Sequence, residues 1–224
     1  MSHWWKYPLP DVLPFSLQVY YSFLVSYGQA IWPLQLFALA AGGIIIWLML
    51  RAGKWDAAIS ILFLAAAWLL VAWLFFATHY ALIFWAAPYF AIAFAVQALL
   101  LILLAIACMR GHSGFADFPR RKFAVVLFTL SVFGYVLAAG ALSHRAPLTE
   151  VFGLFPAPTA AATLAAVAAL KGAIRWIAAL IPIFWNIITA VIFAILGGYE
   201  AAVPPLMTII AILAALAPQR SSSQ

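Results

Sequence analysis

The chain has 224 residues, of which 69% are hydrophobic and only 7% are charged. Soluble domains carry about 25% charged residues, so this composition excludes a soluble globular protein and indicates one that crosses a membrane several times. The apolar runs are long and do not alternate with polar residues, which favours an all-α integral membrane protein over a barrel.

Residues 1–32 are predicted to form an N-terminal arm followed by an amphipathic helix on the outer membrane surface. Pro14 suits the first turn of that helix, and Pro33 marks the turn into the bilayer. Between them, aromatic, apolar and small residues recur at roughly helical spacing, at Leu17, Tyr20, Tyr21, Leu24 and Gly28.

Residues 33–218 contain seven apolar segments and are predicted to form a seven-helix transmembrane bundle, with a short cytoplasmic tail at residues 219–224. A helix that crosses the hydrocarbon core needs about 20 residues, and the fifth and seventh segments are shorter than that. The seven segments are Pro33–Leu50, Ala57–Ala77, Ala87–Met109, Phe123–Leu142, Pro158–Leu170, Trp176–Leu196 and Val203–Ala217.

The distribution of positive charge predicts the orientation of this bundle. With the N-terminus outside, only Lys6 and Arg145 of the 11 Lys and Arg residues fall on the outer side. An excess of Lys and Arg in cytoplasmic loops is the positive-inside rule. We therefore expect a multi-pass protein of the inner (plasma) membrane with a cytoplasmic C-terminus, in contact with membrane lipids. Because the charge is divided among short loops, it does not indicate a nucleic-acid partner.

The fifth segment follows two closely spaced prolines, in the stretch FGLFPAPTAAATLAA at residues 152–166. Proline removes a backbone donor and disfavours a continuing helix, so we expect irregular backbone over Phe152–Ala157 and a helix that starts at Pro158 or Thr159. Thr159 is a candidate N-cap. The alanines that follow predict close packing deep in the bundle. A short, proline-interrupted segment can mark a binding site or merely fill a gap.

Three short motifs connect this chain to a known group of proteins. They are the end of a Tyr-rich arm, from Tyr27 to Trp32-Pro33, the Thr78-His79-Tyr80 triplet, and the F-G-x-x-P-x-P-T pattern of residues 152–159. In these motifs the chain resembles an uncharacterised family of bacterial multi-pass membrane proteins. The resemblance implies the fold and no activity. Members often carry cysteine between the two prolines, where this chain has Ala157.

Two strongly polar side chains, Gln97 and Asn186, lie near the middle of predicted spans. Asn186 follows Pro182 by four residues, at a place where proline frees a backbone carbonyl group. With Thr159 and Thr189 they are the candidate substrate-binding residues. The alternative is hydrogen bonding between helices, worth roughly 1 kcal/mol per bond.

Histidine and carboxylate side chains gather at the predicted outer face. His79 and His144 end the second and fourth segments, and Glu150 precedes the fifth. Together they are a candidate metal site, although no pair shows a ligand spacing such as His-x-x-x-His. The alternative is that the histidines hydrogen-bond to backbone and water at the interface.

Two functional classes follow from these features. The first is a small transporter- or channel-like protein with its path near the broken fifth segment. The second is a non-catalytic accessory subunit of a larger membrane complex, which binds a membrane-protein partner or a second copy and holds a lipid or cofactor. The sequence has no phosphate loop, nucleophile elbow or paired membrane carboxylates, so we expect no enzyme and assign no catalytic residue. It names neither the substrate nor a cofactor.

Overall fold

The computed structural model describes residues 17–137 and 150–196, and over these ranges the chain is helical without a β-strand. Two of the α-helices, Asp56–Leu70 and Phe118–Thr129, continue directly into π-helical segments. The elements in chain order are α1 (Leu17–Ala30), α2 (Leu34–Arg51), α3 (Asp56–Leu70), η3 (Val71–His79), the 3₁₀ turn η4 (Tyr80–Leu82), α4 (Ala87–Met109), α5 (Phe118–Thr129), η5 (Leu130–Gly134), α7 (Pro156–Ala168) and α8 (Ile174–Leu196).

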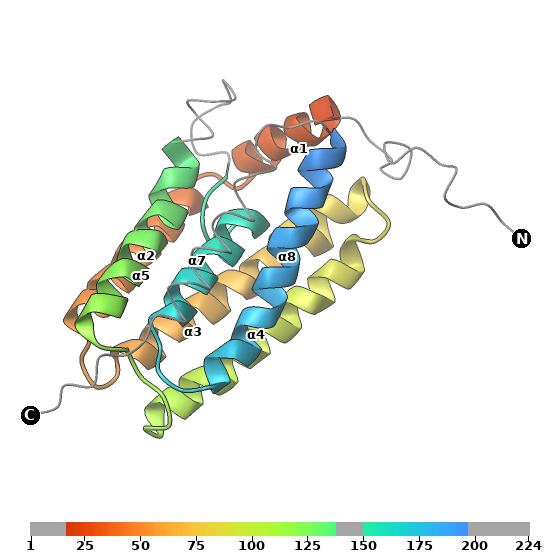
Figure 1. Ribbon diagram of the computed structural model, residues 1–224. Helices are drawn as coiled ribbons and strands as arrows, with labels where there is room; N and C mark the ends of the chain where they lie inside the picture. The colour runs from red at the N-terminus through yellow and green to blue at the C-terminus, as the bar shows by residue number, and fades with distance from the viewer. Residues whose placement is uncertain (1–16, 138–149, 197–224) are drawn as a thin grey trace, which may run out of the picture.

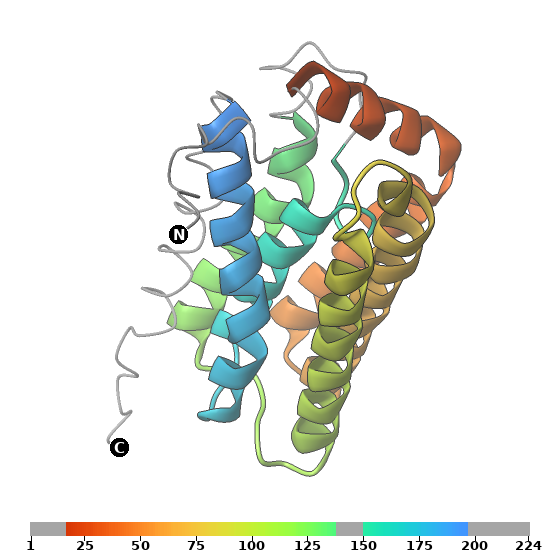
Figure 2. The same ribbon diagram turned by 90° about the vertical axis from the view of Figure 1, so that its right-hand side faces the viewer.

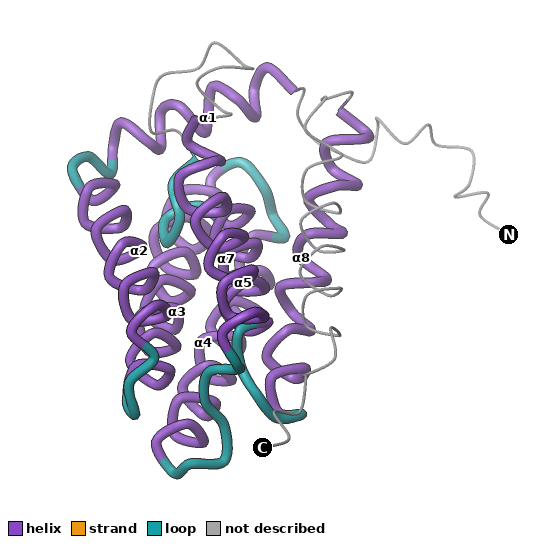
Figure 3. Tube along the Cα trace, turned by 60° about the vertical axis from the view of Figure 1, so that its left-hand side comes forward, coloured by secondary structure: helices purple, strands orange, loops and turns teal. Residues whose placement is uncertain are grey.

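Helix α1 lies crosswise over one end of the bundle (Figures 1 and 2). The connections α2–α3, α4–α5 and α7–α8 lie at the opposite end (Figure 3). A tight turn joins α1 to α2, and its Trp32–Pro33 peptide bond is cis. The two ends of the bundle therefore differ: one carries α1 and the other carries the loops rich in Lys and Arg.

Within residues 17–137 and 150–196, four helices are long and apolar enough to cross a membrane, and they agree closely with predicted segments one, two, three and six. They are Leu34–Arg51, Asp56–Leu82, Ala87–Met109 and Ile174–Ile192. The prediction of an all-helical protein with several membrane-length helices is confirmed in this form.

The count of seven spans is not confirmed. Helix α7 has 13 residues and is therefore about 20 Å long, against the roughly 30 Å of a hydrocarbon core. The fourth segment begins as α5 and reaches Leu137, where the described residues stop. The seventh segment, Val203–Ala217, and the predicted tail lie outside the described residues.

Helix α7 occupies the centre of the bundle and packs against α3, α5, η5 and α8 (Figures 1 and 3). All of its residues except Ala157 are buried. Its alanines present little bulk, so neighbouring helices can approach its backbone closely. The predicted deep, Ala-rich short helix is thus present.

The predicted start of this helix was wrong by two residues. Helix α7 begins at Pro156, after Phe155 in extended conformation. A proline in the first turn loses no hydrogen bond, because the first N–H groups of a helix have no intrahelical partner. Both Pro156 and Pro158 therefore fit inside the first turn. Thr159 is consequently not the N-cap, which is Phe155 and makes no side-chain capping bond.

Candidate functional site

The irregular entrance to α7 is closed by hydrogen bonds within the protein. Gly153, at φ +79°, adopts the left-handed conformation that glycine tolerates best. Its N–H donates to the Thr159 hydroxyl at 2.8 Å, and that hydroxyl donates to the carbonyl of Phe155 at 2.6 Å. Thr159, predicted to bind substrate, thus holds the entrance loop on the first turn of α7.

Helix α1 is tied to the same entrance. The Tyr27 hydroxyl donates to the Leu154 carbonyl at 3.1 Å, and burial raises the pKa of Tyr27 above its ordinary value. The phenol therefore stays protonated and remains a donor. The Tyr27 ring also meets Phe155 edge-on, with centroids 5.0 Å apart. Helix α1 is in this way fixed over the N-terminal end of α7.

The middle of α7 is joined to α3 by a hydroxyl that makes two hydrogen bonds. The Trp68 indole N–H donates to Thr163 Oγ1 at 2.8 Å, and Thr163 in turn donates to the Thr159 carbonyl at 2.8 Å. Both threonines of α7 are fully buried. Their hydroxyl protons are therefore used inside the protein, so neither offers a free donor to a passing ligand.

The C-terminal end of α7 is held by two arginines from neighbouring elements, Arg120 of α5 and Arg175 of α8. Arg120 donates to the carbonyls of Ala168 (2.8 Å) and Leu170 (3.1 Å), and Arg175 also donates to Leu170. The last carbonyls of a helix lack intrahelical partners and carry partial negative charge. Two of the cations that indicate membrane orientation therefore also stabilise the central helix.

At the interface of α4 and α8, Gln97 compensates for a proline. Pro182 lies inside α8 and has no N–H for the carbonyl of Ala178, four residues earlier. The Gln97 side chain donates to this carbonyl at 2.8 Å. Gln97 is fully buried. The hydrogen bond between the two helices therefore accounts for a polar side chain in the middle of the apolar helix α4.

Among the predicted substrate-binding residues, Asn186 is the one whose side chain makes no hydrogen bond within the described residues. It is fully buried, yet neither its amide oxygen nor its amide nitrogen has a hydrogen-bond partner in the described part of the chain. Thr189, one turn further along α8, donates to the carbonyl of Trp185 at 2.9 Å. Asn186 and Thr189 are thus buried residues of α8, and Gln97 reaches α8 from α4 at Ala178, whereas Thr159 lies at the entrance to α7.

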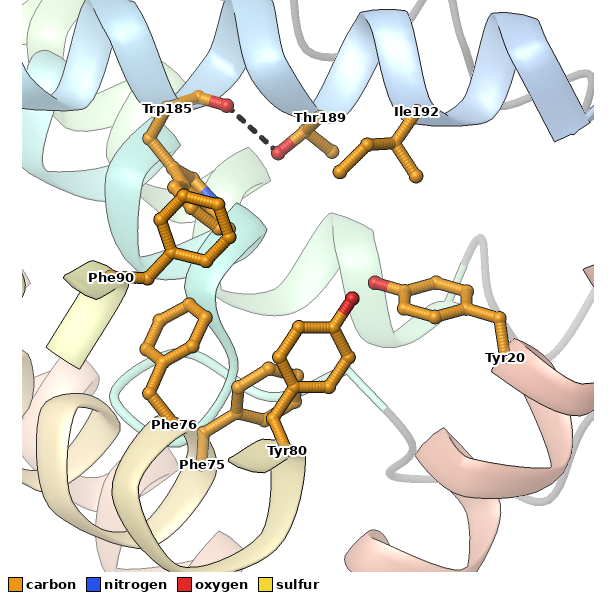
Figure 4. Close-up of a pocket in the computed structure, with 8 residues that line it drawn as sticks. All are labelled: Tyr20, Phe75, Phe76, Tyr80, Phe90, Trp185, Thr189 and Ile192. Atoms are coloured by element: carbon orange, nitrogen blue, oxygen red, sulfur yellow. Dashed lines mark hydrogen bonds between the residues drawn. The ribbon is translucent and has the colours of Figure 1, made fainter. Parts of the chain in front are cut away.

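A small pocket lies next to Thr189, between α1, η3, η4, α4 and α8 (Figure 4). Most of its wall is aromatic, and its cavity volume is about 20 Å³. It is lined by Tyr20, Phe75, Phe76, Tyr80, Phe90, Trp185, Thr189 and Ile192. Except for Thr189, none of these residues was among the sequence candidates. Aromatic side chains at a membrane boundary have a general explanation, which concealed this cluster.

The His79 side chain hydrogen-bonds to the backbone. Its Nδ1 lies 2.7 Å from the Leu74 carbonyl, which only accepts, so Nδ1 carries the proton. Thr78 donates to the same carbonyl at 2.6 Å, and the His79 ring meets Tyr27 edge-on at 5.0 Å. His79 therefore closes the end of η3, where π-helical geometry alters the usual bonding of the last turn.

The proposed metal site has no support within residues 17–137 and 150–196, where no three His, Cys, Asp or Glu side chains gather. Glu150 is half-buried. His144 lies outside the described residues, so a site formed by His79, His144 and Glu150 stays a prediction.

The fold and site define an all-helical protein with a buried central helix and several helices long enough to cross a membrane. The chain belongs to the family described as "Family of unknown function (DUF6064)", whose model matches residues 17–224. No curated protein and no solved structure matches the chain.

Proposed function

We propose that the protein is a non-catalytic subunit of a larger membrane complex. The observation that carries this proposal is the burial and internal hydrogen bonding of α7, the segment expected to border a transport path. Every residue of α7 except Ala157 is buried, and its two threonine hydroxyls donate to backbone carbonyls. A solute path along this helix would need polar groups facing water, whereas this packing suits a rigid scaffold that presents its outer surface to another membrane protein.

The same proposal includes an orientation, with α1 outside and the three short loops in the cytoplasm. It rests on the separation of α1 from the loop-bearing end of the bundle (Figure 3). Basic residues at that end sit beside aromatic rings, as Arg51 does over Trp47 at 4.4 Å and Lys54 over Trp55 at 5.4 Å. Such pairs suit the headgroup region, where aromatic rings and cations both anchor a membrane protein.

Cysteine accessibility separates a closed scaffold from a transporter. In a Cys108→Ala background, Ala162→Cys and Ala165→Cys place a thiol in the middle of α7, and His112→Cys places one in an exposed loop. A small water-soluble methanethiosulfonate reagent added to open membranes should modify His112→Cys and leave both α7 variants unmodified. Rapid modification of either α7 variant would show that water reaches the central helix and would contradict the scaffold proposal.

The partner is tested by mild extraction. Extracting the full chain from its native membrane with a styrene–maleic acid copolymer should yield it together with a second membrane protein in fixed stoichiometry. A monodisperse particle that contains only single copies of this chain would contradict the assignment as a subunit.

Asn186 supports transport as a second candidate function. An amide buried in a membrane-spanning helix without a partner is costly, and intramembrane polar groups often mark substrate paths. The path would then follow the α4–α8 interface rather than α7. Modification of Asn186→Cys, together with protection of Ala165→Cys from the same reagent, would favour this candidate; protection of both favours the scaffold.

A further inference from the structure

At the pocket below α1, a cavity lies beside a buried donor that makes no hydrogen bond within the described residues. Its volume of about 20 Å³ exceeds the roughly 10–15 Å³ that a single water needs. It is far too small for a ring or a chain of a bound molecule. Whatever occupies it enters with a group the size of one oxygen atom.

Trp185 supplies the donor. Its side chain lines the pocket and is only 8% exposed, and its indole N–H has no acceptor in the part of the chain that the structure describes. The indole nitrogen can only donate, and a buried donor without an acceptor is costly. The rings of Phe76, Phe90 and Phe94 surround the indole with centroids 5.0–5.3 Å away, and they offer no oxygen.

The pocket also offers an acceptor for a hydroxyl group, the Oγ1 atom of Thr189. Thr189 Oγ1 uses its proton on the Trp185 carbonyl at 2.9 Å, which leaves lone pairs that accept from an occupant. Figure 4 shows the hydroxyl groups of Tyr20 and Tyr80 pointing toward one another on the side away from the phenylalanines. None of the eight lining residues is charged, so the occupant that suits this wall is neutral.

We propose that this pocket binds one neutral oxygen acceptor, which accepts a hydrogen bond from the Trp185 indole N–H. Two sources supply this chemistry. One is an ordered water, which would also donate to Thr189 Oγ1. The other is the ester carbonyl oxygen of an outer-leaflet lipid, which accepts only.

Nuclear magnetic resonance of the indole groups tests the proposal on the full chain. The protein is deuterated, its tryptophans are labelled with ¹⁵N at the indole, and it is placed in phosphatidylglycerol–phosphatidylethanolamine nanodiscs. The Trp185 signal is assigned by its loss in Trp185→Phe; if that variant does not fold, the signal that moves in Thr189→Val assigns it. Trp85, which is 78% exposed, is the positive control for contact with solvent or lipid.

The expected result is a cross-relaxation peak from the Trp185 indole proton to water or to lipid glycerol protons. A water peak that weakens in Thr189→Val identifies the water. A glycerol peak that persists in Thr189→Val identifies the lipid ester. The control is Thr129→Val, because Thr129 also donates to the carbonyl four residues earlier but does not line the pocket; it should change neither peak. A Trp185 proton without a peak to water or lipid, in a sample where Trp85 shows one, overturns the proposal.

Discussion

The hydrogen bond from Gln97 to the carbonyl of Ala178 should be energetically coupled to Pro182. Replacing Gln97 with Leu keeps most of the side-chain volume and leaves the Ala178 carbonyl without its donor. Replacing Pro182 with Ala restores an N–H four residues after that carbonyl. Gln97→Leu should therefore lower stability when position 182 is Pro and change it little when position 182 is Ala.

The magnitude follows from the burial of this contact. Gln97 is 0% exposed and its nitrogen lies 2.8 Å from the carbonyl. Losing a buried bond and leaving its acceptor unpaired costs about 1–3 kcal/mol, while bonds between membrane helices average about 0.6 kcal/mol with a maximum near 1.7. Because Leu also removes the unpartnered amide oxygen of Gln97, we expect Gln97→Leu to destabilise by about 1 kcal/mol. In the Pro182→Ala background, the cost of Gln97→Leu should fall to about zero.

Equilibrium unfolding from mixed micelles by titration with sodium dodecyl sulfate, followed by circular dichroism, measures both differences. Gln35→Leu is the matched control, because Gln35 is also buried and donates to a backbone carbonyl, that of Gly28, in another part of the fold. Its cost should be the same with Pro182 or Ala at position 182. An equal cost of Gln97→Leu in the two backgrounds would refute the compensation of Pro182 by Gln97.

Three further predictions address the central helix and the orientation. Trp68→Phe should destabilise by about 1 kcal/mol through loss of the hydrogen bond to Thr163. In the double variant, Thr163→Val should add little further destabilisation, as measured by the same unfolding titration. Fully additive effects of the two substitutions would exclude the hydrogen bond as the cause. Arg120→Gln should destabilise by about 1–3 kcal/mol because the carbonyls at the C-terminal end of α7 lose a charged donor. Lys122→Gln, at an exposed position of α5, which also carries Arg120, should change stability by less than about 0.5 kcal/mol. Equal effects of the two substitutions would contradict the capping role of Arg120. In a Cys108→Ala background, an impermeant thiol reagent on whole cells should label Ser2→Cys and not Ser223→Cys, and the reverse pattern would exclude the proposed orientation.

The sequence predicted best what depends on local composition. Helix α4 has the bounds predicted for it, Ala87–Met109, because a continuous apolar run ends at Arg110 and Gly111. The break before α7 was also predicted, since two prolines act on their own backbone. Its start was placed two residues too late because first-turn prolines were treated as helix breakers, although they cost no bond there.

The sequence could not show which polar groups meet across the bundle. Gln97 and Ala178 are 81 residues apart, and their contact depends on which helices are neighbours and on how each is rotated. The roles of Arg120 and Arg175 were hidden for a related reason: positive charge in a cytoplasmic loop already has a topological explanation. His79 resembled a free interfacial ligand because the π-helical turn that it closes leaves no simple sequence pattern.

Two adjacent glycines of α2 provide a test of the helix packing itself. A Cβ atom at Gly42 would lie 2.7 Å from the Cγ1 atom of Val132 in η5, whereas one at Gly43 would meet nothing within 4 Å. Alanine gains about 1 kcal/mol over glycine in a helix, and overpacking a core costs about 1–3 kcal/mol. Gly43→Ala should therefore stabilise by up to about 1 kcal/mol, while Gly42→Ala should destabilise by a similar amount.

The steric cause is separated from other effects by relieving the contact. Val132 is fully buried and its short branched side chain has one strongly preferred rotamer in a helix, so it cannot swing away from a new methyl group. In a Val132→Ala background, Gly42→Ala should lose its destabilising effect and approach the gain of Gly43→Ala. Unfolding titrations of the four variants measure this. If the two glycine substitutions have the same effect with Val at position 132, α2 does not pack on η5 through Gly42.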